Sequence, residues 1–574
     1  MKKKVLVLFK THLDIGYTDT AETVTNNYLT KYLPNAVKVG YRLKNTDTPF
    51  IWTVGSWLIW RALKSEAGPT VEQAIRDGIL RWHALPFTTH TELMSEKLFE
   101  AGLSLSDKLD ERFGFHTVGA KMSDVPGHTI GMVPIMKRHG VKFLHIGANT
   151  ATPMPSVPHI FRWRCGEDEI AVMYQRYYGQ TEDLGDFAVY FAHTGDNEGP
   201  QSAEQIIAEY EKIRKLYPDC EPQAATIDDL AEAVCAMKDL PVVDREIGDT
   251  WIHGAGTDPQ KVSRYRKVLR ALEQYPESPF DLTDNLLLIP EHTWGGDSKQ
   301  FFPYPGGWDV DALAEMKQER QRIEETWSEQ RAYVAKAEKL FGVTPDYPVA
   351  PPDLTGFEEA AADEVPIPCA ISWQLFDNAD FERYKETYLR CREDWALNNC
   401  TKVGLPDYAG GIFDAHIDKA YRKGAESIWF LSFDKTAAEK YGLPTFTVEV
   451  RGEDVTIRWF GKKASRLPQA FWLKFTGFAE NWRIRKMGQW ITPEEIIDSP
   501  LISAVDRGIK NDDAEIVSLD CALVAPFGRR LLQYGVKNAE QDMYFNLYNN
   551  IWNTNFPLWY ADDGLFRFQV KKTV

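Results

Sequence analysis

A histidine and an aspartate stand two positions apart near the start of the sequence, directly after an apolar run. The run covers residues 5–9, and His12 and Asp14 follow it. Side chains at positions i and i+2 of an extended chain point to the same side, so these two could bind one cation, and the pairing suits zinc. The pattern His-x-Asp is common, and a histidine and a loop aspartate that satisfy backbone groups are the alternative interpretation.

A second polar segment, at residues 121–129, contains Asp124 and His128 and precedes a helical pattern. Gly127 permits a tight turn that can present Asp124, and a carboxylate is the usual nucleophile in the hydrolysis of glycosidic bonds. An aspartate that caps the following helix is the alternative. The segment by itself does not decide between the two.

A third segment, at residues 195–200, places Asp196 and Glu198 between glycines in a loop before a helical pattern. Either acid could supply a general acid for catalysis. Both could instead reflect the preference for negative charge at a helix N-terminus.

A fourth segment, at residues 248–256, contains Trp251 and His253 among small residues. Small neighbours let the backbone approach closely, so His253 could project into a pocket. A hydrogen-bonded core histidine is the commoner fate of such a residue.

The elements that must position these segments form an alternating pattern from residue 4 to about 255. Short apolar runs alternate with helical stretches, which is typical of parallel strands joined by crossover helices. The expected strands lie at residues 5–9, 50–54, 143–146 and 170–174. In an α/β barrel the side chains at the C-terminal ends of the strands converge on a substrate. We therefore expect a parallel (β/α) barrel over residues 1–260 that carries the catalytic residues.

The rest of the chain predicts three further regions, so the fold class is multidomain α/β + α + β. Apolar residues at helical spacing indicate a helical bundle at 261–345, and a Pro-rich then acidic stretch opens a connecting region at 346–440. Alternating runs at 446–450 and 455–460 predict a hairpin. A β-sandwich is expected over residues 441–574.

Composition excludes some partners. The 574 residues carry a net charge of −17, which would repel a phosphate backbone, so no nucleic acid is expected. No apolar stretch is long enough to span a membrane, and the run at 5–9 is too short for a secretory signal. The seven cysteines are dispersed without a Cys-x-x-Cys pair, which suits reduced thiols and a cytoplasmic protein.

The four segments occur in an order that resembles the glycoside hydrolase family 38 α-mannosidases. His-x-Asp comes first, an Asp-x-x-Gly-His turn follows some 110 residues later, and a Gly-Asp loop and an aromatic-x-His-Gly segment come next. An aromatic-rich stretch at 161–168 and the Asn- and Trp-containing stretch at 545–556 are similar to strands of that family. The resemblance covers most of the chain, strongly to about residue 260 and loosely beyond.

This resemblance implies a zinc-dependent retaining exo-α-glycosidase that hydrolyses α-mannosides or a related α-linked sugar. His12, Asp14, Asp124 and His253 look like the four protein ligands of one Zn²⁺ ion. Asp124 would also be the nucleophile, and Asp196 the general acid/base.

Other residues are expected to contact the carbohydrate substrate or to compete for a catalytic role. The family usually reads His-x-Asp-Pro-Gly-Trp, where this chain has Ile15, Gly16 and Tyr17, and Pro126 stands where the family commonly has Phe. Glu198 is the rival general acid/base. The expected substrate-binding residues are Tyr17, His90, Glu92, His128, Glu198 and Trp251. The polar segment 291–297 receives no role beyond a pocket wall.

Two other functions compete with the glycosidase. A metal-dependent carbohydrate deacetylase or esterase also gathers Asp and His around zinc, although such sites normally hold more than one His close in sequence. A glycan-binding relative without turnover is the third hypothesis. Self-association into a homo-oligomer stays open, because no motif specifies it.

Overall fold

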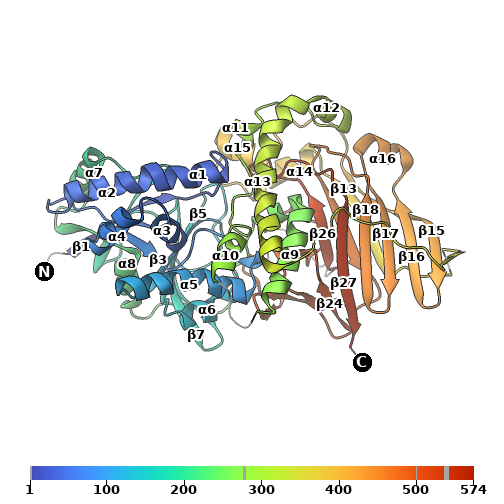
Figure 1. Cartoon of the computed structure of the whole chain (residues 1–574), viewed down its shortest axis with the longest axis horizontal. Coiled ribbons are helices and arrows are strands. Elements are labelled where there is room, and N and C mark those ends of the chain that lie inside the picture. Colours follow the sequence, from blue (N-terminus) through green and yellow to red (C-terminus); the bar gives the residue numbers. More distant parts are fainter. Residues whose placement is uncertain (1–2, 276–279, 363, 499–500, 536–541, 574) are drawn as a thin grey trace. The chain divides into compact units, whose positions relative to one another are not determined.

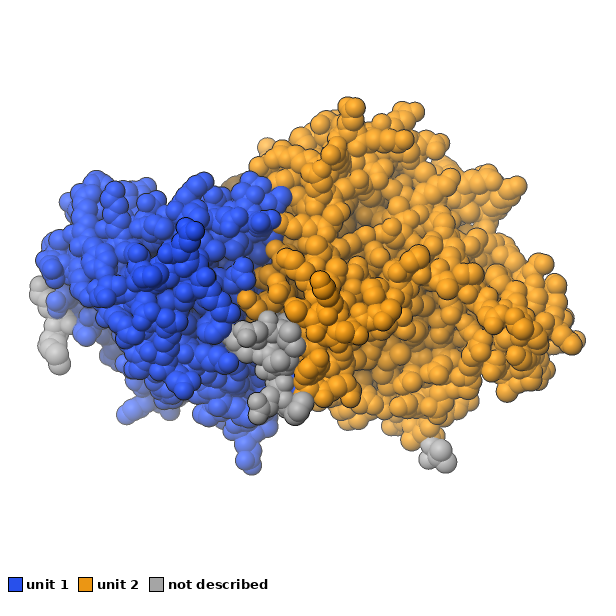
Figure 2. Space-filling model, in the orientation of Figure 1, with its two compact units in different colours: residues 1–91, 96–247, 290–293 blue, residues 92–95, 248–289, 294–574 orange. Residues whose placement is uncertain are grey.

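The computed structural model (Figure 1) divides the chain into two compact units, which Figure 2 draws in different colours. It describes residues 3–275, 280–362, 364–498, 501–535 and 542–573. Unit 1 comprises Met1–Thr91, Glu96–Ile247 and Pro290–Thr293, and unit 2 comprises Glu92–Ser95, Gly248–Ile289 and Trp294–Val574. The predicted boundaries near residues 260, 345 and 440 make a different division, and they stay predictions.

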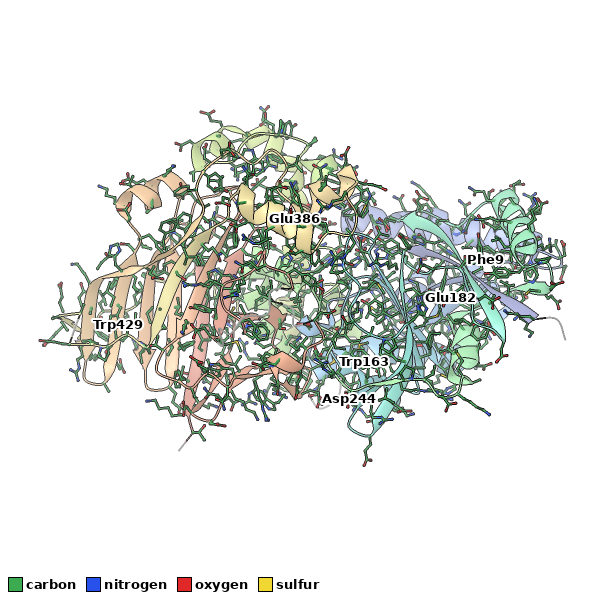
Figure 3. All side chains as sticks on the ribbon, turned by 180° about the vertical axis from the view of Figure 1, so that it is seen from behind. Phe9, Trp163, Glu182, Asp244, Glu386 and Trp429 are labelled. Atoms are coloured by element: carbon green, nitrogen blue, oxygen red, sulfur yellow. The ribbon has the colours of Figure 1, made fainter. Side chains whose placement is uncertain are left out.

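The first sheet of unit 1 is built around strand β1, in the order β3-β2-β1-β9-β8, with β10 also paired to β1. Its strands are β1 (Lys3–His12), β2 (Trp52–Gly55), β3 (Leu80–His83), β8 (Glu182–Asp183), β9 (Phe187–Asp196) and β10 (Cys220–Ala224). Strand β1 runs parallel to β2, β9 and β10. Its apolar residues from Val5 to Phe9 are all buried, as a strand covered on both faces requires. Phe9 is labelled in Figure 3.

The second sheet of unit 1 has the order β11-β6-β7-β5-β4. Its strands are β4 (Gly119–Asp124), β5 (Phe143–Ala148), β6 (Ile160–Cys165), β7 (Asp168–Arg176) and β11 (Val242–Val243). Strands β4, β5 and β7 are parallel, whereas β6 is antiparallel to β7. The α/β class is therefore confirmed. In the described residues the strands pair as two sheets, and closure into one barrel stays a prediction.

Helices connect the parallel strands of unit 1. They are α1 (Ala21–Asn27), the π-helix η1 (Tyr28–Tyr32), α2 (Leu33–Leu43), α3 (Ser56–Leu63), α4 (Gly68–Arg76), α5 (Glu96–Phe113), α6 (Met132–Arg138), α7 (Ala203–Leu216) and α8 (Ile227–Cys235). Helices α7 and α8 each begin with a capping box, from Ser202 and Thr226 respectively. Ile227 and Leu230 of α8 bury their side chains with Leu6, Leu8 and Val189 of the first sheet. This core fixes the strands whose ends carry the polar residues.

Unit 2 contains the other helices. They are η3 (Ile252–Thr257), α9 (Pro259–Leu272), α10 (Phe280–Leu287), α11 (Ser298–Phe301), α12 (Val310–Glu315), α13 (Lys317–Phe341), α14 (Asn378–Thr387), α15 (Asp394–Cys400), α16 (Lys435–Tyr441) and η4 (Pro493–Glu495). The short 3-10 helix η2 (Thr91–Leu93) lies where the chain first passes between the units. Arg264 of α9 and Glu338 of α13 form an ion pair of 2.5 Å with both side chains largely buried. The helical character predicted for 261–345 is confirmed, and its arrangement as a bundle stays a prediction.

Two antiparallel sheets complete unit 2. The ten-stranded sheet has the order β12-β15-β16-β17-β18-β27-β24-β23-β20-β21, and the six-stranded sheet β14-β13-β19-β26-β25-β22. The strands are β12 (Glu358–Ala360), β13 (Cys369–Leu375), β14 (Gly411–Asp414), β15 (His416–Lys423), β16 (Glu426–Ser432), β17 (Thr445–Arg451), β18 (Asp454–Phe460), β19 (Gln469–Phe475), β20 (Arg483–Lys486), β21 (Gln489–Ile491), β22 (Ser503–Ala504), β23 (Gly508–Lys510), β24 (Ala514–Ser518), β25 (Leu523–Ala525), β26 (Tyr544–Asn549) and β27 (Gly564–Lys572). Rings from both sheets meet, since Trp459 of β18 lies 5.6 Å from Phe471 of β19. This packing is that of a β-sandwich.

Two expectations from the sequence concern these sheets. The predicted hairpin is confirmed as β17 and β18, which pair in antiparallel register. Strands β12 to β16 lie within 346–440, the stretch expected to be a connecting region, and they pair into the same two sheets. Among the described residues no helix is long and apolar enough to cross a membrane.

Candidate metal centre

Three polar residues of the sequence prediction lie at the C-terminal ends of strands in unit 1. His12 ends β1, Asp124 ends β4 and Asp196 ends β9. His12 and Asp196 are register partners across the parallel pair of β1 and β9. Parallel strands that end at one edge of a sheet bring their terminal side chains together, which explains why His12 and Asp196 meet. Asp124 ends a strand of the second sheet.

Ligand atoms of His12, Asp124 and His292 lie within 4.8 Å of one another, and Asp14 contacts both histidines. His12 Nε2 is 3.1 Å from Asp14 Oδ1, and His292 Nε2 is 3.0 Å from the same oxygen. The two Nε2 atoms are 3.0 Å apart, and His292 Nε2 is 3.6 Å from Asp124 Oδ2. Imidazole nitrogens together with carboxylate oxygens are a donor set that suits Zn²⁺. The residues present therefore fit a bound metal ion.

His292 is the residue of this cluster that the sequence analysis did not assign. It belongs to Pro290–Thr293, the short segment that returns the chain to unit 1. Thr89 Oγ1 donates to the Pro290 carbonyl at 2.6 Å, His90 N donates to the same oxygen at 2.9 Å, and Thr89 and Glu291 form an isolated β-bridge. The signal in the sequence was the polar run 291–297 inside a helical region.

Glu291 orients the His292 ring. Its Oε1 lies 2.6 Å from His292 Nδ1, and its Oε2 accepts from Thr293 N at 2.9 Å. Burial opposes charge on His292, but the Glu291 and Asp14 carboxylates outweigh it and raise the His292 pKa well above its usual value. A carboxylate only accepts hydrogen bonds, so the Nδ1 proton faces Glu291 and Nε2 faces the cluster.

Asp14 is held by a turn that Asn197 closes. Asn197 Oδ1 accepts from Asp14 N at 3.0 Å, and Asn197 Nδ2 donates to the Gly16 carbonyl at 3.1 Å. Burial would raise the Asp14 pKa, but the His12 and His292 imidazoles reverse this effect and lower it. Asp14 is therefore ionised in the cluster. Tyr17, an expected sugar contact, lies in the same turn with a positive φ of 62°.

Asp124 is fixed through one of its two oxygens. Asn149 Nδ2 and the Tyr178 hydroxyl each donate to Asp124 Oδ1 at 2.7 Å. The backbone at Asp124 has a φ of 78°, a left-handed conformation that a non-glycine residue rarely adopts and that clusters at functional sites. The Oδ2 atom is left to face His292. Asp124 therefore ends its strand with an oriented carboxylate, and it does not act as a helix cap.

Asp196 differs from the other two carboxylates. Burial, repulsion from Asp14 and a smaller contribution from Asp124 raise its pKa to about 7, against attraction from His12. It can form a ligand group with His12 and Asp14, because their atoms lie within 4.8 Å of one another. Glu198, the rival acid in the same loop, is exposed. A carboxyl group that titrates near neutrality suits proton donation and return.

The structure places His253 and Trp251 in unit 2. His253 lies in η3, where its ring meets Trp552 edge-on at 4.4 Å and its carbonyl accepts from Asn549 Nδ2 at 2.8 Å. Trp251 also packs edge-on against Trp552. The assignment of His253 as a metal ligand stays a prediction, and the clustered histidines of unit 1 are His12 and His292.

The remaining expected sugar contacts are buried. His128 lies in unit 1, where its backbone N donates to the Ile247 carbonyl at 2.8 Å, and His90 lies beside Pro290 as described above. Glu92 belongs to unit 2 and forms a 2.8 Å ion pair with Lys486, with both side chains fully buried. These observed contacts are structural, and contact of these residues with a sugar stays a prediction.

Comparisons with known proteins support the glycosidase fold. A family model described as "Domain of unknown function (DUF5054)" matches residues 255–343, and no curated protein matches the sequence. An α-mannosidase from Enterococcus faecalis V583 is similar over 100% of this chain and 87% of its own, with a TM-score of 0.59 and 10% identity. A glycosyl hydrolase family 38 protein from Enterococcus faecalis gives 0.52 and 9%, with 100% and 86% covered.

These likenesses define the class of fold. The chain shares its fold with these two proteins at low sequence identity, so the fold implied by the resemblance to family 38 is confirmed. Identity this low shows the fold, whereas function depends on the residues of the site.

Proposed function

We propose that the protein is a zinc-dependent, retaining exo-α-glycosidase that acts on α-mannosides or a related α-linked sugar. The observation that supports the proposal is the gathering of ligand atoms of His12, Asp124 and His292 within 4.8 Å of one another in unit 1, with Asp14 in contact with both histidines. These four side chains would hold the metal ion. His253 is the alternative fourth ligand that the family resemblance implies. A bound Zn²⁺ ion would supply positive charge that orients two hydroxyl groups of the sugar.

Asp124 would act as the nucleophile. Its carboxylate is held by hydrogen bonds from Tyr178 and Asn149 to Oδ1, while Oδ2 faces the proposed metal ligands, and the carboxylate would attack the anomeric carbon. The bond from carbon to the leaving oxygen breaks as the bond to Asp124 forms, and a glycosyl-enzyme results. The two hydrogen bonds to Oδ1 fix the direction of attack.

Asp196 would move the proton in both steps. Its raised pKa keeps a fraction of the carboxyl protonated near neutral pH, so it can protonate the leaving oxygen. As a carboxylate it then takes a proton from the water that attacks the glycosyl-enzyme. Two displacements at the anomeric carbon retain its configuration.

A direct experiment tests this proposal. The purified full-length chain is assayed with a panel of aryl α-glycosides, before and after removal of divalent metal by a chelator, and after zinc is restored. We expect release of the aryl alcohol that disappears on chelation and returns with zinc. NMR of the first product formed should show the α-anomer.

Other outcomes would contradict the proposal. Release of acetate from acetylated sugars without cleavage of glycosides would favour the deacetylase or esterase. Sugar binding without turnover in the zinc-loaded protein would favour the glycan-binding relative. An initial β-anomer would exclude the retaining mechanism.

A further inference from the structure

We propose that a hollow on the outer face of the ten-stranded sheet of unit 2 is a binding site for a neutral oligosaccharide. The hollow has a volume of about 720 Å³, which lies within the roughly 300–1,000 Å³ typical of sites for small molecules. Its lining residues come from the segments 481–483, 492–494 and 510–515 and from Thr573. All of them belong to unit 2, so the inference goes beyond the proposed function and does not rest on it.

The floor of the hollow is a row of polar side chains across three strands. Arg483 of β20 is the register partner of Lys510 of β23, and Lys510 is the partner of Glu515 of β24. Register partners of an antiparallel pair point to the same face of the sheet. The next row along these strands is buried and consists of Ile484, Ile509 and Ile516. The polar row therefore lies on the outer face of the sheet, in which β24 is labelled in Figure 1.

One wall of the hollow is built by hydrogen bonds between two loops. Asn481 Nδ2 donates to Asp512 Oδ2 at 2.8 Å, which joins the segment before β20 to the turn between β23 and β24. The backbone of Ala479 adds two bonds of 2.6 Å, because its carbonyl accepts from Asn511 Nδ2 and its N–H donates to Asp513 Oδ2. The wall is therefore formed before a ligand arrives, and a preformed site loses less conformational entropy on binding.

The lining offers hydrogen-bond donors and acceptors of both charges. The charged residues that line the hollow are Arg483, Lys510, Glu494, Asp512 and Glu515. Two of them are basic and three are acidic, so a free anion or a free cation would meet like charges as well as opposite ones. A hydroxyl group both donates and accepts hydrogen bonds, so a ligand rich in hydroxyl groups can use both kinds of side chain. This is the chemistry of an uncharged sugar.

Three of these charged groups are available to a ligand. Among the described residues, no carboxylate oxygen lies within 4.0 Å of the side-chain nitrogens of Arg483 or Lys510. Glu494 is exposed to solvent. Glu515, in contrast, forms a 2.9 Å ion pair with Arg507. We therefore expect Arg483, Lys510 and Glu494 to make the direct hydrogen bonds to the ligand.

Indole rings add an apolar surface to the site. Trp482 lines the hollow and is 8% exposed, and its ring meets that of Phe478 edge-on at 6.0 Å. The Trp490 ring lies beside the hollow, where its centre is 4.2 Å from Lys510 Nζ. The C–H face of a sugar ring is apolar and suits contact with an aromatic ring. Aromatic and charged groups together therefore fit a sugar better than an inorganic ion.

Oligosaccharide binding can be measured without metal and without turnover. The metal-free full-length protein is titrated with α- and β-linked oligosaccharides of mannose and glucose, and binding is followed by calorimetry. We expect Arg483→Met and Glu494→Gln each to weaken binding by about tenfold, because each removes a hydrogen bond from a charged group. Both residues are exposed, so the two variants should melt at the wild-type temperature.

Matched controls come from exposed residues of the same sheet. Arg422→Met on β15 and Glu453→Gln in the turn between β17 and β18 change the same charges away from the hollow, and both should bind as the wild type does. The inference is overturned if the wild type binds none of the oligosaccharides, or if Arg483→Met and Glu494→Gln bind as tightly as these controls. Tighter binding of inorganic phosphate or of an oligohexuronate than of every neutral oligosaccharide would also overturn it.

The same variants separate this inference from the proposed glycosidase. Loss of oligosaccharide binding in Arg483→Met and Glu494→Gln, in a wild type that cleaves no glycoside after zinc is restored, would keep this site and reject the proposed function. Cleavage of an aryl α-glycoside, together with oligosaccharide binding that these substitutions do not weaken, would reject this site and keep the proposed function.

Discussion

Buried polar residues have different roles in the two units of this protein. In unit 2 the buried Glu92 and Lys486 neutralise each other, and Glu92 also accepts hydrogen bonds from the backbone of Asp249 at 2.9 Å and Ala504 at 2.8 Å. Asn550 is equally well satisfied, because its amide group donates to three backbone carbonyls and its oxygen accepts from Gln469 N. Such complete pairing stabilises a fold.

In unit 1 the buried groups crowd together without such balance. Asp14 and Asp124 each lie close to His292, and Asp196 is close enough for both carboxylates to raise its pKa. Proteins keep such groups together when a ligand or a reaction requires them. The paired buried residues of unit 2 therefore stabilise the fold, whereas the crowded residues of unit 1 are positioned by the fold for a ligand or a reaction. Substitutions should affect the two groups differently.

The largest effect is expected for Asp124→Asn. Loss of the nucleophile should reduce turnover of an aryl α-glycoside by about 10⁴-fold. Stability should change little, because a neutral amide relieves the crowding of negative charge in the cluster. Steady-state kinetics and thermal melting measure the two quantities. An active Asp124→Asn variant would remove Asp124 from its catalytic role.

Lys486→Met should lower the stability of the fold, which Asp124→Asn leaves nearly unchanged. It leaves Glu92 charged and buried, so the free energy of unfolding should fall by about 3–5 kcal/mol. Denaturant unfolding measures it. The control is Lys435→Met, which removes an exposed ion pair of 4.0 Å and should have little effect. Adding Glu92→Gln should recover part of the loss, and no loss in Lys486→Met would show that the pair does not stabilise unit 2.

His292→Ala and His253→Ala compare the two units directly. We expect His292→Ala to weaken zinc binding by at least about 100-fold, because a ligand is lost rather than a supporting group. His253→Ala should bind zinc as the wild type does. Competition with a chromophoric chelator measures both affinities. The reverse result would return the fourth ligand to His253, as the family resemblance implies.

Glu291→Gln should have a smaller effect on the same affinity. A glutamine can still accept from His292 Nδ1, but it is a weaker partner for the ring, so we expect a loss of about tenfold. Glu291→Leu, which cannot accept, should lose more. Nitrogen NMR of the His292 ring reports the proton on Nδ1 directly. An unchanged ring spectrum in Glu291→Leu would contradict the orienting role.

Asp228→Asn should have the smallest effect, which is a pH-dependent change in the free energy of unfolding. Burial raises the Asp228 pKa from 3.8 to about 6, against hydrogen bonds that its Oδ1 accepts from the backbone N–H groups of Val118 and Gly119. The folded state then binds more protons than the unfolded state, so wild-type stability falls as pH rises from about 4 to 6. Relative to wild type, the variant should gain about 1–2 kcal/mol across this range. A constant difference would contradict the shift.

The sequence predicted the parts of the site that lie next to a clear local pattern. Residues 5–9 are apolar at every position, so both the buried strand β1 and the polar residues at its exit, His12 and Asp14, could be identified. Asp124 was identified as a carboxylate beside a turn that Gly127 permits. The resemblance to family 38 added the order of these segments.

Other features depend on contacts that no local pattern records. His292 joins the cluster because residues 88–90 bind a segment some 200 positions later, and only its unusual polarity marked it. Strand β15 was missed because it is largely exposed and charged, so it lacks the alternation typical of half-buried strands. The pairing of unit 1 as two sheets likewise follows from registers between distant strands.

The brief return of Pro290–Thr293 to unit 1 constrains how this chain can be divided. The residues before and after this segment belong to unit 2, so unit 1 is not continuous in the sequence. A fragment that stops at Ile247 would keep every strand of the first two sheets yet lose one proposed metal ligand and the carboxylate that orients it. An evolutionary exchange of the segment after Ile247 would lose the same two residues.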